Sequence, residues 1–289
     1  MMRPPAPPPL FTAIRKQFHT DLLQSIFTVD AAGIPSNADS SSKASKLFAQ
    51  GIYVRVTTET ATAVRGAGQS SGRKFENIVQ DFIAETFPLL AHLRPGTWDI
   101  RAAGPRNIAH FEQYAHLIAL KAAARHDKVL AAAIQSDYTI EPDIIIAREP
   151  EDDSVINAHS VLVGADIAAR ATLRKVFNPR ATLHASISCK WTLRSDRAQN
   201  ARSEALNLIR NRKGHLPHIV VVTGEPLPSR IASLALGTGD LDCVYHFALN
   251  ELIQAADDAG YDDSKELLEI MVEGKRLKDI SDLPLDLAV

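Results

Sequence analysis

The stretch TLHASISCKWTLRSDRAQNARSEALNLIRNRKG, residues 182–214, predicts the central structural unit of this chain. Its first nine residues alternate between polar and apolar side chains, which is the period of two expected of a strand with one apolar face. Ser188 and Lys190 therefore point to the same side, with Lys190 at the exposed end of the strand. An arginine-rich turn follows the strand.

The second half of the stretch predicts an amphipathic helix. Ser195 suits the N-cap position and Gly214 the end of the helix. Arg197 and Glu204 are seven residues apart, so at ~3.6 residues per turn they share a face and lie roughly 10 Å apart along the axis. One helix thus offers an arginine at its start and a carboxylate two turns deeper. The apolar residues that recur at helical spacing are Ala198, Ala201, Ala205, Leu208 and Ile209.

The distribution of charge says more than its total. The 289 residues carry a net charge of −2, which is no signature of a nucleic-acid-binding protein. Residues 189–215, however, contain seven Lys/Arg against two Asp/Glu, whereas residues 251–289 contain four against eleven. This asymmetry allows a concentrated basic patch on a protein that is acidic elsewhere. Taken alone, the basic segment is better explained as a solvated charged helix.

The composition indicates a reduced, cytoplasmic protein. The chain has only two cysteines, Cys189 and Cys243, and its start, MMRPPAPPPL, lacks the apolar core of a secretion signal. No run approaches the ~20 apolar residues of a membrane span, so we expect no membrane contact. Residues 1–9 are expected to be a disordered tail of a single domain that spans residues 1–289.

Periodicity and turn residues predict the remaining elements. Helices are expected over 11–26, 75–87, 106–135 (with a possible break near His126), 228–236, 248–257 and 264–272, and 44–64 is either helix or strand. Further strands are expected around 139–149, 217–226 and 242–247, with a loop over 31–45 and an irregular insertion over 149–180. Helices around such strands predict an α/β fold with a central mixed β-sheet flanked by helices.

Two acids outside the central unit are candidates for chemistry. Asp143 stands beside the apolar run Ile144–Ile146, where a carboxylate is costly unless it is paired or binds a cation. An aspartate at the mouth of a strand is also common without a function. Glu76 lies beside the apolar stripe of the helix over 75–87, and alone it would be a surface glutamate. The glycine-rich segment 66–72 lacks the pattern of a phosphate-binding loop and is better explained as a connector.

The spacing of these residues is reminiscent of a nuclease signature. Pro142 and Asp143 followed by Lys190 match the outline of the PD-(D/E)XK pattern, in which a strand aspartate and a second acid two residues before the lysine hold the metal ion. Ser188 occupies the place of that second acid here. Glu204, on the helix that leaves the lysine strand, is the natural substitute. As a pattern alone this signal is weak, because Pro-Asp and a lysine recur by chance.

Longer runs make the resemblance specific. The runs SISCKWTLRSDRAQNARSEALNLIRNRKG, LPHIVVVTGEPLPSRIASLALGTGDLDCVYHFALNEL and GKRLKDISDLPLDLAV, with GQSSGRKFE and SDYTIEPDIII before them, are similar to type II restriction endonucleases of the PD-(D/E)XK superfamily, in the tetrameric group that reads CCGG. The resemblance extends more loosely over the whole chain. It departs in the proline-rich tail and in residues 149–180.

The resemblance implies an active site. It makes Asp143 the central ligand of magnesium, joined by the backbone carbonyl of Cys189 and by Glu204. It makes Lys190 the catalytic lysine and Glu76 an outer acid that organises metal-bound water. Two Mg²⁺ ions are expected, one activating the attacking water and one stabilising the leaving 3′ oxygen.

The resemblance also implies a DNA-reading element, in residues Arg194, Ser195, Asp196 and Arg197. An arginine fork can donate twice to guanine and an aspartate can accept from cytosine, so this run suits a G·C-only target. By resemblance it reads CCGG, while Gln69 in the minor groove and Arg230 in the major groove read the flanking pair, which gives GCCGGC.

The resulting expectation is a Mg²⁺-dependent type II endonuclease that cuts double-stranded DNA and leaves 5′-phosphate ends. A two-fold symmetric target calls for at least a dimer, and the resemblance adds a homotetramer and a cognate DNA methyltransferase in the same restriction–modification system, with no direct contact implied. The alternative is a non-cleaving, sequence-specific DNA-binding protein on the same scaffold. A structure-selective repair nuclease is a further alternative, although it has no need of the arginine-rich turn.

Overall fold

One mixed β-sheet organises the chain, as the sequence predicts. The computed structural model describes residues 7–60, 72–102, 108–129, 142–237 and 239–289. Within these residues the sheet has six strands in the order β1-β2-β3-β4-β5-β6. The first three pair antiparallel and β3 to β6 pair parallel. The strands are β1 (Trp98–Ala102), β2 (Ile144–Arg148), β3 (Thr182–Lys190), β4 (His218–Thr223), β5 (Cys243–His246) and β6 (Leu277–Asp279).

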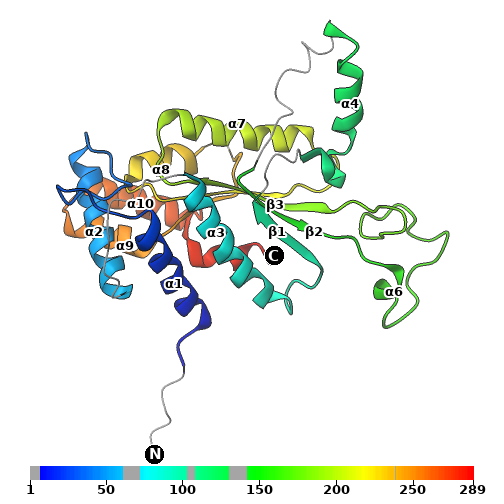
Figure 1. Ribbon diagram of the computed structural model, residues 1–289, viewed down its shortest axis with the longest axis horizontal. Coiled ribbons are helices and arrows are strands. Elements are labelled where there is room, and N and C mark those ends of the chain that lie inside the picture. The colour runs from blue at the N-terminus through cyan, green and yellow to red at the C-terminus, as the bar shows by residue number, and fades with distance from the viewer. Residues whose placement is uncertain (1–6, 61–71, 103–107, 130–141, 238) are drawn as a thin grey trace, which may run out of the picture.

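Helices cover both faces of the sheet. Figure 1 shows α7 (Ser195–Asn211) and α8 (Pro228–Ala235) on one face, and α1 (Leu10–Ser25) and α3 (Gly72–Thr86) on the other. Around the β6 end lie α2 (Lys43–Thr60), α9 (Leu249–Asp258) and α10 (Asp262–Glu273), followed by the short α11 (Leu283–Asp286). The segment predicted as helix or strand over 44–64 is therefore helical as far as Thr60. None of the helices in these described ranges could cross a membrane.

The register of β3 positions the site. Its interior residues are buried, and β3 continues to Lys190, where it lies beside Thr223 at the end of the parallel strand β4. On the other side, Ile144 of β2 pairs with Ile187 in antiparallel register. Asp143 precedes Ile144, so this register carries its backbone toward Ser188 and the end of β3.

The start of the helical stretch predicted over 106–135 is wrong, whereas the break predicted near His126 is present, because α4 (His116–Ala124) ends before it and residues 125–127 are not helical. In the described part of this stretch the chain forms two 3-10 turns, Ile108–His110 and Glu112–Tyr114, and then the nine residues of α4. The buried amide of Gln113 explains the interruption, because it donates to the carbonyl of Leu183 at 2.7 Å and accepts from the Leu183 N–H at 2.9 Å. These tertiary hydrogen bonds to β3 override the helical propensity of the alanine-rich sequence.

Two strands were absent from the prediction. β1 is an edge strand of five residues that are only partly buried, so its sequence lacks a clear apolar alternation. β6 has three residues, which is too short for a periodic pattern.

The insertion over 149–180 is an arm that projects from the body of the protein (Figure 1). It contains one short helix within the described residues, α6 (Asp153–Ile156). The fully buried guanidinium of Arg174 holds the arm in shape, donating to the Asp153 carboxylate at 2.6 and 2.9 Å and to the Gly164 carbonyl at 2.9 Å.

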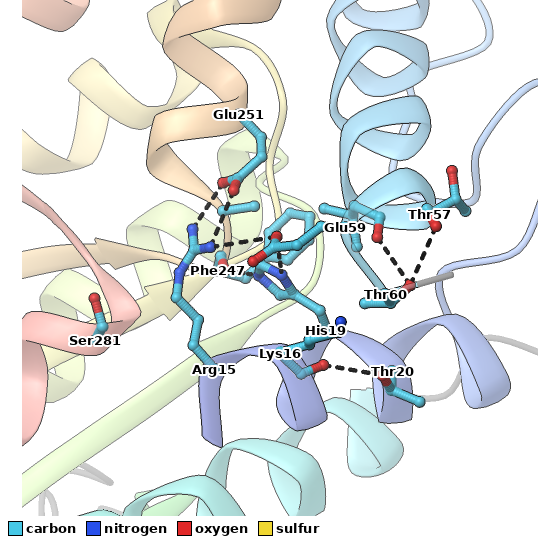
Figure 2. Close-up of polar contacts among 12 residues, drawn as sticks. Arg15, Lys16, His19, Thr20, Thr57, Glu59, Thr60, Phe247, Glu251 and Ser281 are labelled. Carbon is cyan, nitrogen blue, oxygen red and sulfur yellow. Dashed lines mark hydrogen bonds and ion pairs between the residues drawn. The ribbon is translucent and has the colours of Figure 1, made fainter. Parts of the chain in front are cut away.

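A buried ion network fastens the first helix to the body. Arg15 of α1 donates to both carboxylate oxygens of Glu251 in α9, at 3.0 and 2.7 Å, and to both oxygens of Asp279 at the end of β6, at 2.9 and 2.8 Å. Figure 2 shows the guanidinium facing Glu251, with Glu59 of α2 nearby. Burial would lower the pKa of Arg15, but these two carboxylates outweigh burial and raise it.

Candidate active site

The carboxylate of Asp143 is the point on which three donors converge. Its Oδ2 accepts hydrogen bonds from the Lys190 Nζ at 2.8 Å, the Cys189 N–H at 2.7 Å and the Ser188 hydroxyl at 3.3 Å. Ser188 and Lys190 do point to the same side of β3, as predicted. All three of these donors come from β3 and use the same oxygen, Oδ2.

The lysine is held as an ammonium group. Its side chain is 17% exposed and that of Asp143 20% exposed. Burial would lower the pKa of Lys190, but the charge and hydrogen bond of Asp143 outweigh burial and raise that pKa above its usual value, with a further contribution from Glu204. A charged lysine beside two acids can offset negative charge that develops on a phosphate.

Two more predicted acids face the same space. Glu204 from α7 and Glu76 from α3 are both half-buried and line one cavity with Lys190. Burial, followed by the charge of Asp143, raises the pKa of Glu76, whereas Lys190 opposes this rise. The structure therefore gathers the predicted acids and the lysine from four separate segments of sequence.

The cavity also receives the predicted DNA-reading arginines. Its volume is about 520 Å³, and Arg194, Arg197 and Arg230 contribute to its wall. Arg197 and Glu204 line the same cavity from α7, which confirms the shared helix face. Arg197 donates to the Thr192 hydroxyl at 2.9 Å, just after the lysine strand. The arginine guanidinium groups of this cavity can bind the phosphates of a polyanion. The carboxylates of the same cavity can hold a metal ion next to that polyanion.

One wall of the cavity was not foreseen from the sequence. Residues 36–40, expected only as part of a loop, line it together with residues of α7 and α8. Asn37 is buried and donates to the Gly224 carbonyl at 2.8 Å, and Asp39 accepts a hydrogen bond from Arg230. Hydrogen bonds from Ser41, followed by Arg230, lower the pKa of Asp39. The run SNADSSS was the only signal, and its polarity also fits an ordinary loop.

The other predicted positions have varied outcomes. α7 begins one residue earlier than expected, because Arg194 is the N-cap and Ser195 the first helical residue. Asp196 is exposed on the first turn of α7. Gln69 lies outside the described residues, as do residues 66–71 of the expected connector and residues 1–6 of the expected tail.

The side chain of Cys189 is buried as an inert group. Its thiol is buried, and burial raises the thiol pKa well above the usual value. Its backbone contributes to the site instead, because the N–H donates to Asp143.

The residues present fit a hard divalent cation. Magnesium is commonly bound through one or two carboxylates and keeps several waters, so it does not need a closed cage of protein ligands. Asp143 supplies a carboxylate whose three contacts from β3 all use Oδ2, and Glu204 lines the adjoining cavity. Among the described residues, the one group of three acids or histidines with ligand atoms within 4.8 Å of one another is His19, Glu59 and Glu251. We interpret that group as part of the ion network, because Arg15 already donates to both oxygens of Glu251.

Comparisons with known proteins agree with this arrangement. The family model described as NgoMIV restriction enzyme matches residues 18–289. The type II restriction enzyme NgoMIV of Neisseria gonorrhoeae is 55% identical over 285 residues, covering 97% of this chain and 99% of that protein. These matches define the class: the chain is a type II restriction endonuclease, an enzyme that cleaves DNA at specific sites. It belongs to the NgoMIV restriction enzyme family.

Two solved structures are more distant. The restriction endonuclease PspGI in a substrate DNA complex is 16% identical, covers 96% of this chain and 92% of its own, and has a TM-score of 0.32. The type IIF restriction endonuclease Bse634I with cognate DNA is 12% identical, covers 89% of this chain and 92% of its own, and has a TM-score of 0.35.

Proposed function

We propose that this enzyme uses Mg²⁺ to hydrolyse double-stranded DNA at GCCGGC and leaves 5′-phosphate ends. The observation that carries the proposal is the convergence of Lys190, Cys189 and Ser188 on one oxygen of Asp143 at the wall of a cavity that Glu204 also lines. This arrangement supplies both the cation ligands and the ammonium group that phosphodiester hydrolysis requires.

Each residue has a distinct role in the proposal. Asp143, Glu204 and the backbone carbonyl of Cys189 would hold two magnesium ions, and the chemistry supplied by the bound ions would be activation of water and stabilisation of the leaving 3′ oxygen. Lys190 orients the water and offsets charge on the scissile phosphate. Glu76, whose raised pKa follows from burial and from Asp143, orders water at the outer edge of the site.

Base reading is assigned to the arginine-rich turn. Arg194, Asp196 and Arg197 recognise the CCGG core, with Ser195 in the same turn. Arg230 reads the flanking base pair in the major groove and Gln69 in the minor groove. Support comes from the position of Arg194, Arg197 and Arg230 on the wall that also holds Lys190, because a base pair bound there lies close to its own scissile phosphate.

The active assembly in this proposal is a homotetramer, with one single-domain subunit per DNA strand. The projecting arm supports association, because it exposes apolar side chains that a monomer would leave in water. These are Val155, Val161, Leu162, Ile167, Val176 and Phe177, all at least 46% exposed. We place the enzyme in the cytoplasm beside a DNA methyltransferase that protects the same sites and makes no contact with it.

Digestion of a phage DNA of known sequence tests the proposal directly. The DNA is incubated with the purified enzyme, with and without Mg²⁺, and the ends are sequenced. Cuts confined to GCCGGC, only with magnesium, and ends that a ligase joins without added kinase are expected. Cuts at another sequence would reject the site assignment. Sequence-specific binding with intact DNA would instead favour a binding protein on the nuclease scaffold.

A further inference from the structure

A fully buried carboxylate outside the catalytic group connects the elements of this site. Glu225 follows β4 in the turn toward α8 and is 0% exposed. It does not contribute to the wall of the active-site cavity. Removing a carboxylate from water is costly unless hydrogen bonds or charges compensate. Its partners therefore indicate why this turn carries a glutamate.

The two oxygens of Glu225 hold two separate segments. Oε2 accepts the backbone N–H of Leu193 at 2.7 Å, and Oε1 accepts the N–H of Leu227 at 3.2 Å. Leu193 immediately precedes Arg194, the N-cap of α7, while Leu227 is the N-cap of α8. A single side chain thus fixes the points from which the arginine-rich turn and the helix of Arg230 begin.

Glu225 also contacts one of the arginines directly. The Nη1 of Arg230 lies 3.8 Å from Oε2, while its Nη2 donates to Asp39, which also lines the cavity. Two carboxylates therefore hold this guanidinium between them. The other two arginines of the cavity, Arg194 and Arg197, stand on the element whose start Glu225 holds.

The backbone around Glu225 is fixed to the catalytic strand. The carbonyl of Lys190 accepts hydrogen bonds from the Gly224 N–H at 3.1 Å and the Thr223 hydroxyl at 2.8 Å. Gly224 is packed so closely that a Cβ there would lie 2.4 Å from the Trp191 ring. The backbone next to Glu225 is therefore held in a fixed position relative to Lys190, whose side chain carries the catalytic ammonium group.

We propose that Glu225 is a positioning residue for sequence recognition, which holds the Arg194–Arg197 turn and Arg230 in a fixed place relative to Lys190. The inference rests on the proposed assignment of these arginines to base reading. Glu225 touches neither DNA nor metal in this scheme. It acts by fixing the backbone from which the reading side chains extend, so that correct base contacts and correct placement of the scissile phosphate occur together.

Glu225→Gln is the informative substitution. Glutamine keeps the shape of the side chain but replaces one accepting oxygen with an NH₂ group, which would face the N–H of Leu193 or Leu227. The exposed glutamate Glu266 on α10, changed to glutamine, is the matched control. Burial raises the pKa of Glu225 to about 7, so assays at pH 8 compare an ionised carboxylate with a neutral amide.

The measurement is the ratio of affinities for a GCCGGC duplex and a scrambled duplex, in Ca²⁺ buffer without cleavage. Glu225→Gln is expected to lower this ratio about tenfold, because misplaced arginines lose base contacts. Affinity for the scrambled duplex, which depends on phosphate contacts, is expected to stay the same. A purely structural role would lower the melting temperature or the active fraction and leave the ratio intact. A folded Glu225→Gln protein with the wild-type ratio overturns the proposal.

Two further variants close the test. If Glu225→Gln does not fold, Glu225→Asp replaces it, because aspartate keeps the negative charge on a shorter side chain. A lower ratio of affinities for Glu225→Asp then supports the positioning role, and an unchanged ratio overturns it. Arg194→Ala separates the two assignments. If Arg194→Ala leaves the ratio unchanged, the base-reading assignment itself fails. If Arg194→Ala lowers the ratio and Glu225→Gln does not, only the positioning role fails.

Discussion

The ammonium group of Lys190 lies 2.8 Å from Oδ2 of Asp143, although the two residues are 47 positions apart in the sequence. The antiparallel register of β2 and β3 causes this approach, because it pairs Ile144 with Ile187. Lysine and aspartate therefore meet through backbone pairing in the sheet and not through flexible side chains alone. Preorganised groups of this kind need little rearrangement when the reaction begins.

Replacement of the lysine should separate cleavage from binding. Lys190→Ala is expected to abolish plasmid cleavage in Mg²⁺ while keeping specific binding in Ca²⁺, because the arginines that read DNA are untouched. Gel-shift and plasmid-nicking assays measure the two properties. Lys213→Ala, at the far end of the basic segment, is the control and should cut normally. Cleavage by Lys190→Ala at a rate near that of the wild type would reject the assigned mechanism.

Loss of one reading arginine should reduce discrimination and not general affinity. Arg194→Ala is expected to lose about 1–3 kcal/mol of discrimination at the base pair it contacts. Arg210→Ala, exposed at the other end of α7, should leave discrimination unchanged and at most weaken binding to all sequences alike. Competition binding with duplexes that differ in one base pair measures both. Equal effects of the two substitutions would contradict the assignment of the turn.

The central strand and helix were predictable because their signals are local. The alternation up to Lys190 and the helical spacing after it appear in a single stretch, so both elements and the shared face of Arg197 and Glu204 followed from sequence. The contact of Asp143 with that stretch depends on strand order and register, which no local pattern contains. The resemblance to the endonuclease family indicated that Asp143 belongs with Lys190. The register of β2 against β3 gives the physical reason for their contact.

Contacts between distant segments account for what the sequence did not reveal. Gln113 interrupts an alanine-rich helix only because Leu183 lies beside it. Asp39 becomes a wall of the site only because Arg230 reaches it from α8. Glu225 looks like an ordinary turn residue until its oxygens are seen to hold Leu193 and Leu227. In each case the partner is at least 30 residues away or lies in another element.

Removal of the buried guanidinium should destabilise the protein strongly. Arg15→Met leaves Glu251 and Asp279 without their cation, and breaking such a buried pair costs about 3–5 kcal/mol. Arg55→Met is the matched control, because Arg55 pairs with the exposed Asp258, and an exposed pair contributes only about 0–1 kcal/mol. Urea unfolding at pH 7 measures the free energy of unfolding of each variant. Similar losses for both would show that the Arg15 network is energetically no different from a surface pair.

Stability should fall as the pH drops from about 6.5 toward 4, because two buried histidines resist protonation. Burial lowers the pKa of both His184 and His246 to about 4, so in this window the unfolded chain binds two protons that the folded chain does not. Glu225 acts in the opposite direction, since its pKa of about 7 lets the folded chain hold one proton that the unfolded chain releases. Among these three groups the net difference of one proton contributes about 1.4 kcal/mol per pH unit to the rise of the free energy of unfolding with pH. Glu225→Gln removes the opposing proton and should steepen the slope by about 1.4 kcal/mol per pH unit, as chemical denaturation at several pH values will measure. An unchanged slope would mean that Glu225 is not protonated in the folded protein within this window.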